Sequence, residues 1–161
     1  MATAALILVT AVWGITFVQV KDAVELYPLL AFLAIRYLIA TAALAPIALR
    51  RLGGFGREGL VAGSVLGVLI ALGIGLQTAG LERTTVTSTG FITGLYVLFT
   101  PLLGLALFRT PIPRSLWAGV ALALVGLALL SGVPQGSGGG DVLVRIGAFV
   151  QVFHVVMVER Y

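Results

Sequence analysis

The stretch GLVAGSVLGVLIALGIGLQTAGL, from Gly59 to Leu81, decides the class of fold to which this chain belongs. It contains no Asp, Glu, Lys or Arg, and it exceeds the ~20 apolar residues that an α-helix needs to cross a bilayer. The whole chain has the same character, since 60% of its 161 residues are hydrophobic, 10% are charged and the mean hydropathy is +1.14. Soluble domains carry ~25% charged residues, so a water-exposed globular surface is excluded. The sequence therefore predicts an all-α integral membrane protein.

Charged residues mark the ends of the other spans, because Asp, Lys and Arg each cost ~2.5 to 3.5 kcal/mol at the centre of a transmembrane helix. Six helices of ~20 residues leave no room for a soluble catalytic domain. The glycine-rich stretch 134–141 is expected to be a flexible linker, which separates a first unit, 1–133, from a last helix within 142–161. The predicted spans are residues 3–20, 29–49, 59–81, 84–108, 115–133 and 142–158.

Basic residues are distributed unevenly between the two predicted sides of the membrane. Short cytoplasmic loops carry an excess of Lys and Arg. One side holds only Lys21 and Arg83, with Arg145 just inside the sixth span, and the other holds six arginines. This bias predicts that the N-terminus and the end after the sixth helix are cytoplasmic. The six arginines are Arg50, Arg51, Arg57, Arg109, Arg114 and Arg160.

Small residues recur at every fourth position of the third span. In lipid, helices associate through close van der Waals packing, which small residues at this spacing permit. The stripe predicts that the third helix is packed between neighbours, in preference to a hinge function. Its members are Gly59, Gly63, Gly67, Ala71, Gly75 and Ala79.

Two ionisable residues lie inside predicted spans. Arg36 could bind an anionic group of a ligand or a helix carbonyl end, or it could serve equally well as an interface anchor or a brace between helices. His154 could relay a proton, but a neutral, hydrogen-bonded histidine is favoured because no acidic partner is obvious. No buried acid is expected, since all six carboxylates fall at span ends or in loops. They are Asp22, Glu25, Glu58, Glu82, Asp141 and Glu159.

Neutral polar and aromatic groups near the middle of the spans predict a cavity for a modest-sized polar or amphipathic solute. About half of them could instead be hydrogen-bonding glue between helices. Pro101 is expected to break the hydrogen-bond ladder of its helix, because proline lacks a backbone N–H. The candidate lining residues are Trp13, Thr16, Gln77, Tyr96 and Thr100, with Gln19, Thr78 and Thr93 as further polar groups.

Several other functions are excluded or disfavoured. The chain has no cysteine and one histidine, so thiolate catalysis, disulfides and a metal cluster are not expected. Gly63-Ser64 lacks the G-x-S-x-G spacing of an esterase, and no ATP-binding P-loop motif is present. The dispersed basic residues disfavour nucleic-acid binding. We therefore expect neither an enzyme nor a bound cofactor.

Several motifs, in their order along the chain, resemble the EamA-type branch of the drug/metabolite transporter (DMT) superfamily. The first span carries a Trp-Gly followed by Thr-Phe and a lysine, and the second carries an arginine followed by an aromatic residue. Further similar stretches form the junction of the third and fourth spans and parts of the fourth and fifth. The motifs are Trp13-Gly14-Ile15-Thr16-Phe17-Val18 with Lys21, Arg36-Tyr37, residues 76–81 leading into 84–96, Thr100-Pro101-Leu102, and residues 117–126.

The resemblance implies a ten-helix secondary transporter made of two five-helix repeats that works by alternating access. An odd number of spans in each repeat inverts the second copy, an architecture that places the binding site near the midplane. Residues 1–133 would then be the first repeat and 142–161 the first helix of an incomplete second one. This leads to the expectation of a fragment of an exporter of small metabolites or drug-like compounds, in the cytoplasmic membrane of a prokaryote.

Two alternatives stay open beside the transporter fragment. The chain could be a non-transporting membrane scaffold that pairs its small-residue stripe with another chain. It could also be a half-transporter that works only as an oligomer, although the charge bias speaks against insertion in both orientations. The expected partners are the lipid bilayer, a small-molecule solute, and either the missing second repeat or a homodimer partner.

Overall fold

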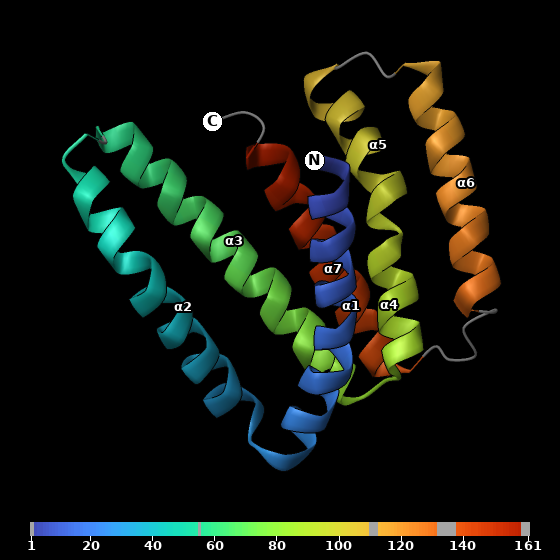
Figure 1. Cartoon of the computed structure of the whole chain (residues 1–161), viewed down its shortest axis with the longest axis horizontal. Coiled ribbons are helices and arrows are strands. Elements are labelled where there is room, and N and C mark those ends of the chain that lie inside the picture. Colours follow the sequence, from blue (N-terminus) through green and yellow to red (C-terminus); the bar gives the residue numbers. More distant parts are fainter. Residues whose placement is uncertain (1, 55, 110–112, 132–137, 159–161) are drawn as a thin grey trace.

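The computed structural model is built from helices alone (Figure 1). It describes residues 2–54, 56–109, 113–131 and 138–158, and no strand occurs within these four stretches. The helices are α1 (Ala2–Leu26), α2 (Leu29–Leu52), α3 (Arg57–Glu82), α4 (Val86–Gly94), α5 (Tyr96–Phe108), α6 (Arg114–Ser131) and α7 (Gly139–Val158).

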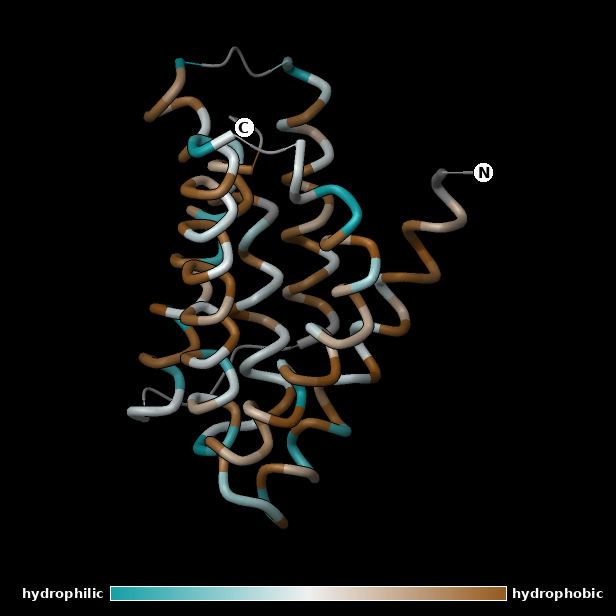
Figure 2. The backbone as a smooth tube through the Cα atoms, turned by 90° about the vertical axis from the view of Figure 1, so that its left-hand side faces the viewer, coloured by the Kyte–Doolittle hydropathy of each residue, from teal (hydrophilic) through white to brown (hydrophobic). Residues whose placement is uncertain are grey.

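Within the described residues, five segments are long and apolar enough to cross a bilayer, with α4 and α5 counted together because only Leu95 separates them. The helix α6 adds a shorter apolar segment, Arg114–Leu129. Hydrophobic residues run along most of the helices (Figure 2), and many large ones are exposed, such as Leu30 at 79%. Such surfaces are stable in lipid and not in water. The prediction of an all-α membrane protein is confirmed.

Two helices extend beyond the charged or glycine-rich residues that were expected to end them. Helix α1 continues past residue 20 to Leu26, and Lys21 and Glu25 form an ion pair at 3.4 Å on its last turns. Charged residues one turn apart support a helix where it leaves the membrane, so they mark the end of the apolar segment and not of the helix. Helix α7 begins at Gly139, inside the predicted linker. Residues 132–137 and 159–161, including Glu159 and Arg160, lie outside the described residues.

The fourth span is interrupted at Leu95. Helix α5 runs through Pro101, while the backbone N–H of Leu95 is shared between the carbonyls of Phe91 and Ile92 at 3.2 and 3.3 Å. Next to this point, a Cβ on Gly94 would lie 2.8 Å from the side chain of Leu127 in α6. The interruption therefore coincides with a tight contact between the fourth span and α6.

The most extensive contact in the described chain joins α3 to α7. A Cβ on Gly80 would lie 2.6 Å from the carbonyl oxygen of Gly140, and one on Gly147 would lie 2.8 Å from the backbone N of Gln77. A third close point is Gly73, where a Cβ would meet the side chain of Gln151 at 2.5 Å. The two backbones touch because glycines of α3 face glycines of α7, a geometry that favours association in lipid.

The predicted stripe of small residues does not make this contact, which corrects the expectation for α3. A Cβ on Gly63 or Gly67 would meet nothing within 4 Å, whereas one on Gly75 would reach only Leu33 of α2, at 4.0 Å. The backbones can approach closely only where both helices present glycine, and α7 presents its glycines to another face of α3. Of the other stripe members, Gly59, Ala71 and Ala79 are half-buried.

Polar contacts hold the helices together at the end of the molecule where α3 meets α4. The Lys21 ammonium of α1 donates to the carbonyl oxygens of Leu81 and Glu82 at 3.1 and 2.9 Å. These carbonyls belong to the last turn of α3, whose acceptors have no partner within the helix. A cation there is also favoured by the helix dipole.

Asp141, in the first turn of α7, is buried at the same end with 2% of its surface exposed. One of its oxygens, Oδ1, accepts hydrogen bonds from the hydroxyls of Thr84 and Ser88, the second at 2.8 Å. The expectation that no acid is buried was therefore wrong. The reason is that Gly140 lets α7 start against the backbone of Arg83, where an added Cβ would lie 2.8 Å from the carbonyl group.

Candidate solute-binding site

A small cleft of about 30 Å³ between α1, α2 and α3 brings together four of the seven predicted pathway residues. Trp13 and Thr16 come from α1, Arg36 from α2 and Gln77 from α3. These four polar or aromatic side chains meet within helices that are otherwise mostly apolar. The rest of the lining consists of Phe17, Val20, Ile74, Thr78 and Leu81.

The threonine hydroxyls of this cleft donate to their own helices. Thr16 Oγ1 donates to the carbonyl of Trp13 at 2.6 Å, and Thr78 Oγ1 donates to that of Ile74 at 2.8 Å. A hydroxyl has one proton and two lone pairs, so both oxygens keep acceptor capacity. Toward a solute, the two threonines therefore act mainly as hydrogen-bond acceptors.

Gln77 is held on both sides of its carboxamide. Its Nε2 donates to Thr93 Oγ1 of α4 at 2.7 Å, and its Oε1 accepts from Gln151 Nε2 of α7 at 3.3 Å. Gln77 and Gln151 are 7% and 2% exposed, so this chain of bonds is buried. Buried side-chain networks with satisfied partners fix one arrangement of the helices that carry them. Gln77 is thus presented to the cleft in a fixed orientation.

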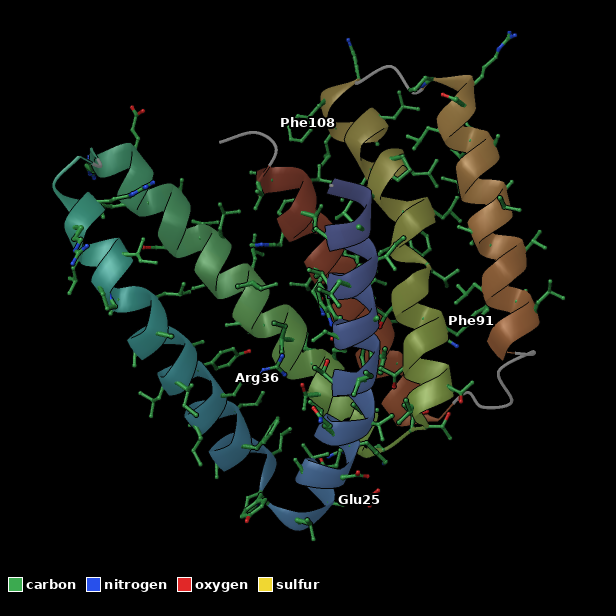
Figure 3. All side chains as sticks on the ribbon, viewed as in Figure 1. Glu25, Arg36, Phe91 and Phe108 are labelled. Carbon is green, nitrogen blue, oxygen red and sulfur yellow. The ribbon has the colours of Figure 1, made fainter. Side chains whose placement is uncertain are left out.

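Arg36 is exposed, and its guanidinium makes no hydrogen bond or ion pair with any residue that the structure describes. Figure 3 shows its side chain extending from α2 toward α3. The next residue, Tyr37, donates its hydroxyl to the carbonyl of Ala71 at 3.0 Å, which ties α2 to α3 beside the cleft. Tyr37 thereby sets the position of the helix turn that carries Arg36.

A second cleft, of about 590 Å³, lies on the other side of α1 and brings Trp13 together with Tyr96. Thr93 also lines it, so the Gln77–Thr93 hydrogen bond bridges the walls of the two clefts. The Tyr96 hydroxyl is buried and has no hydrogen-bond partner in the described part of the chain. The remaining lining residues are Thr10, Gly14, Phe17, Val86, Thr87, Gly90, Gly94 and Leu127.

The structure does not bring Thr100 or His154 to either cleft. Thr100 is half-buried in α5. The His154 ring lies between α7 and α3, with Nδ1 3.0 Å from the carbonyl oxygen of Leu66. An Nδ1–H of this ring donates to that carbonyl, so the contact joins α7 to α3.

Three residues of the site region were missed or undervalued by the sequence analysis. Gln151 orients Gln77, Asp141 anchors the start of α7, and Tyr37 ties α2 to α3. The available signal for Gln151 was a glutamine inside an apolar span, a residue type that is costly there unless it is hydrogen-bonded. Asp141 offered no such signal, because a carboxylate at a span end is normally solvated.

The sequence pattern of the EamA-like transporter family matches residues 1–132. The chain belongs to this family. It is also similar to an uncharacterized transporter from Archaeoglobus fulgidus (strain ATCC 49558), at 33% identity over 156 residues, which are 97% of this chain and 48% of that protein. The EamA chain thus spans about half the length of this curated relative. No solved structure matches it.

The family match confirms the resemblance that the motifs of α1 to α6 indicated. It ends at residue 132, before α7 begins, so the helix that packs most extensively on α3 lies outside the matched range. Three of the four residues that meet in the cleft, Trp13, Thr16 and Arg36, belong to the EamA-like motifs of the first two spans. The fourth, Gln77, belongs to the motif before the α3–α4 turn.

Proposed function

We propose that this EamA chain forms one wall of the solute pathway of a secondary transporter for small metabolites or drug-like compounds. The observation that carries the proposal is the cleft in which Trp13, Thr16, Arg36 and Gln77 meet. Ligand sites are concave, largely apolar and equipped with a few convergent polar groups. An ionisable residue within a membrane span is by default a candidate for such a site.

The remaining walls would come from a second, inverted repeat of a ten-helix protein that works by alternating access. The length of the Archaeoglobus fulgidus relative supports this, since 156 matched residues are 48% of it. The loose packing of α2 supports it too, because large side chains such as Leu38, at 69%, are exposed along that helix. We propose that residues 1–133 form the first repeat and 142–161 the first helix of the second, with α7 joining the two.

The proposed orientation has the N-terminus in the cytoplasm of a prokaryotic cell and transport directed outward. The α2–α3 turn and the facing ends of α5 and α6 lie at the same end of the molecule (Figure 1). The arginine count assumes that these arginines lie on one side of the membrane. The arrangement supports this, because Arg50 and Arg51 fall at this end together with Arg109 and Arg114. Short loops rich in arginine stay in the cytoplasm.

The proposal is tested by export from cells that express the full-length natural protein. Metabolites in the medium are compared between cells with the wild-type protein, Trp13→Ala, Gln77→Ala and the control Trp117→Ala. Trp117 lies on α6 and lines neither cleft. We expect cells with either cleft variant to export less metabolite than cells with the wild-type protein at equal membrane abundance. Cells with the control variant should export as much as the wild type. Equal export from all four proteins would contradict the assignment of the cleft.

A second candidate is a membrane scaffold or half-transporter that works only as an oligomer. It is favoured by the open face at Gly63 and Gly67, where a helix of another copy would find room. The 161 residues contain no cysteine, so Gly63→Cys introduces a single thiol here. Rapid disulfide crosslinking of Gly63→Cys in native membranes would support an oligomer, and crosslinking no faster than that of Thr10→Cys would argue against it.

A further inference from the structure

We propose that the cleft between α1, α2 and α3 selects solutes that carry a carboxylate on an apolar body, and that the Arg36 guanidinium binds the carboxylate. The inference rests on the proposed transport function, because it concerns the same cleft. It adds a substrate class, which neither the family nor the relative supplies. Four observations carry it, namely the unpaired charge, the hydrogen-bond donors of the cleft, the second groove at Arg36, and the depth of the residue in its helix.

The first observation is the charge of the lining. Arg36 is the only charged residue among those that line the two clefts flanking α1 in the described structure. Lys21, the basic residue of the first-span motif, already has partners. It forms an ion pair with Glu25 and donates hydrogen bonds to the carbonyls at the end of α3. A guanidinium stays protonated in proteins and presents its donors in a fork that matches a carboxylate. An anionic solute supplies the partner that the described chain does not.

The second observation is which hydrogen-bonding groups remain free. The oxygen of Gln77 is engaged by Gln151, whereas its Nε2 has two protons and uses one on Thr93. The Trp13 indole N–H makes no hydrogen bond within the described residues. Together with Arg36, these groups offer N–H donors to the cleft. No carboxylate lines it, so an ammonium group would meet no opposite charge in the cleft, whereas a carboxylate would meet Arg36.

The third observation is that Arg36 also lines an apolar groove of about 470 Å³ between α1 and α2. Arg36 therefore lines both a cleft that contains several polar side chains and a groove that is mostly apolar. A solute whose carboxylate binds Arg36 can place its apolar part along this groove. The groove is otherwise lined by Ala23, Tyr27, Ala31, Phe32, Ile35 and Ile39.

The fourth observation is depth. Arg36 lies eight residues beyond Pro28, which corresponds to ~12 Å along the helix axis. Half of the hydrocarbon core is ~15 Å thick, so the Cα lies well below the level of the lipid phosphates. An unpaired cation at this depth is unfavourable and requires a partner. Leu33 against Gly75, and the Tyr37–Ala71 hydrogen bond, hold this turn of α2 against α3 on the cleft side.

The test measures binding and uptake of three probes of similar shape by the full-length protein in phosphatidylcholine liposomes. The probes are phenylacetate, phenylacetamide and phenethylamine. We expect phenylacetate to bind and enter preferentially, and Arg36→Gln to weaken its binding by about tenfold or more, as expected for the loss of one charge-assisted contact. Arg36→Lys should retain part of the affinity, and the matched control Arg50→Gln on the same helix should retain all of it.

Three results would overturn the inference. Equal or stronger binding of phenethylamine or phenylacetamide would refute anion selection while leaving transport itself in place. Phenylacetate binding that Arg36→Gln leaves unchanged would move the anion site elsewhere. If Arg36 instead binds a lipid phosphate, Arg36→Gln would release phosphatidylglycerol detected by native mass spectrometry without affecting the probes. Should Arg36→Gln fail to fold, Arg36→Lys decides: weaker phenylacetate binding with the anion preference kept supports the inference, and phenylacetate binding as strong as that of the wild type contradicts it.

Discussion

The two halves of α3 have the same glycine-rich, apolar composition but different surroundings. In the C-terminal half, Gly73 and Gly80 bring the backbone of α3 against α7, and Gln77 bonds to two other helices. In the N-terminal half, Gly63 and Gly67 face open space. In α3, glycine brings two helix backbones into contact only in the half that faces the glycines of α7. A small-residue stripe on one helix does not identify its own partner.

The same comparison locates the rigid and the loose parts of the candidate site. The cleft rests on the C-terminal half of α3, through Ile74, Gln77 and Thr78. Its other wall, α2, has few contacts with the rest of the described chain and is largely exposed. We therefore expect solute selectivity to depend on a fixed α3 wall, whereas changes between conformations would involve α2. Four substitutions test how far the two halves of α3 differ.

Gly80→Leu should have the largest effect. A Cβ at this position would lie 2.6 Å from the Gly140 carbonyl and 2.8 Å from the backbone N of Val144, and backbone atoms cannot move aside as a flexible side chain can. Overpacking of this kind costs ~1–3 kcal/mol or more. We expect loss of folded protein in detergent, measured by fluorescence-detected gel filtration. A wild-type elution profile would refute direct contact between the α3 and α7 backbones.

Asp141→Ala should lower the free energy of unfolding by ~1–3 kcal/mol, because the hydroxyls of Thr84 and Ser88, at the end where α3 meets α4, would lose their acceptor. Asp141→Asn keeps a side-chain oxygen at the same place and should cost less. Thermal unfolding of the purified protein measures both. Equal melting temperatures for Asp141→Ala and wild type would mean that this carboxylate does not anchor α7.

Gln151→Leu should have a smaller effect on stability, of ~0.6 kcal/mol, the average for hydrogen bonds between membrane helices. It leaves the Gln77 oxygen without its donor, so solute binding should weaken although Gln151 does not line the cleft. A double-mutant cycle with Gln77→Leu measures the coupling. Additive effects of the two substitutions would show that Gln151 does not position Gln77.

Gly63→Leu should have the smallest effect, within about 0.5 kcal/mol, because the added side chain enters open space. It is the matched control for Gly80→Leu, since both place the same side chain on the same helix. Destabilisation comparable to that of Gly80→Leu, seen only in the full-length protein, would show that further chain packs on the N-terminal half of α3.

The sequence predicted those features that depend on composition along one helix. Apolar length identified the helices, and the positions of Trp13, Thr16, Arg36 and Gln77 within their spans indicated residues that the structure brings into one cleft. The features that depend on contact between distant segments could not be read in this way. Glycine is common in all these helices, so neither the α3–α7 pairing nor the burial of Asp141 has a local signature.

Thr100 and His154 were predicted to line the pathway, but they do not line either cleft. Both are polar residues within apolar helices, like Thr16 and Gln77, yet neither lines a cleft with them. Helical rotation and pairing decide whether a polar side chain faces a cavity or a neighbouring backbone. His154 faces the carbonyl of Leu66, a contact that depends on how α7 crosses α3.

Protection of single cysteines by a solute tests most directly whether the cleft between α1, α2 and α3 is the binding site. Thr16→Cys and the comparison variant Thr100→Cys are placed in full-length protein without other reactive thiols, and the rate of thiol modification is measured with and without phenylacetate. We predict that phenylacetate slows modification at position 16 and leaves the rate at position 100 unchanged, because only Thr16 lines the cleft. Protection at position 100 with none at position 16 would contradict it.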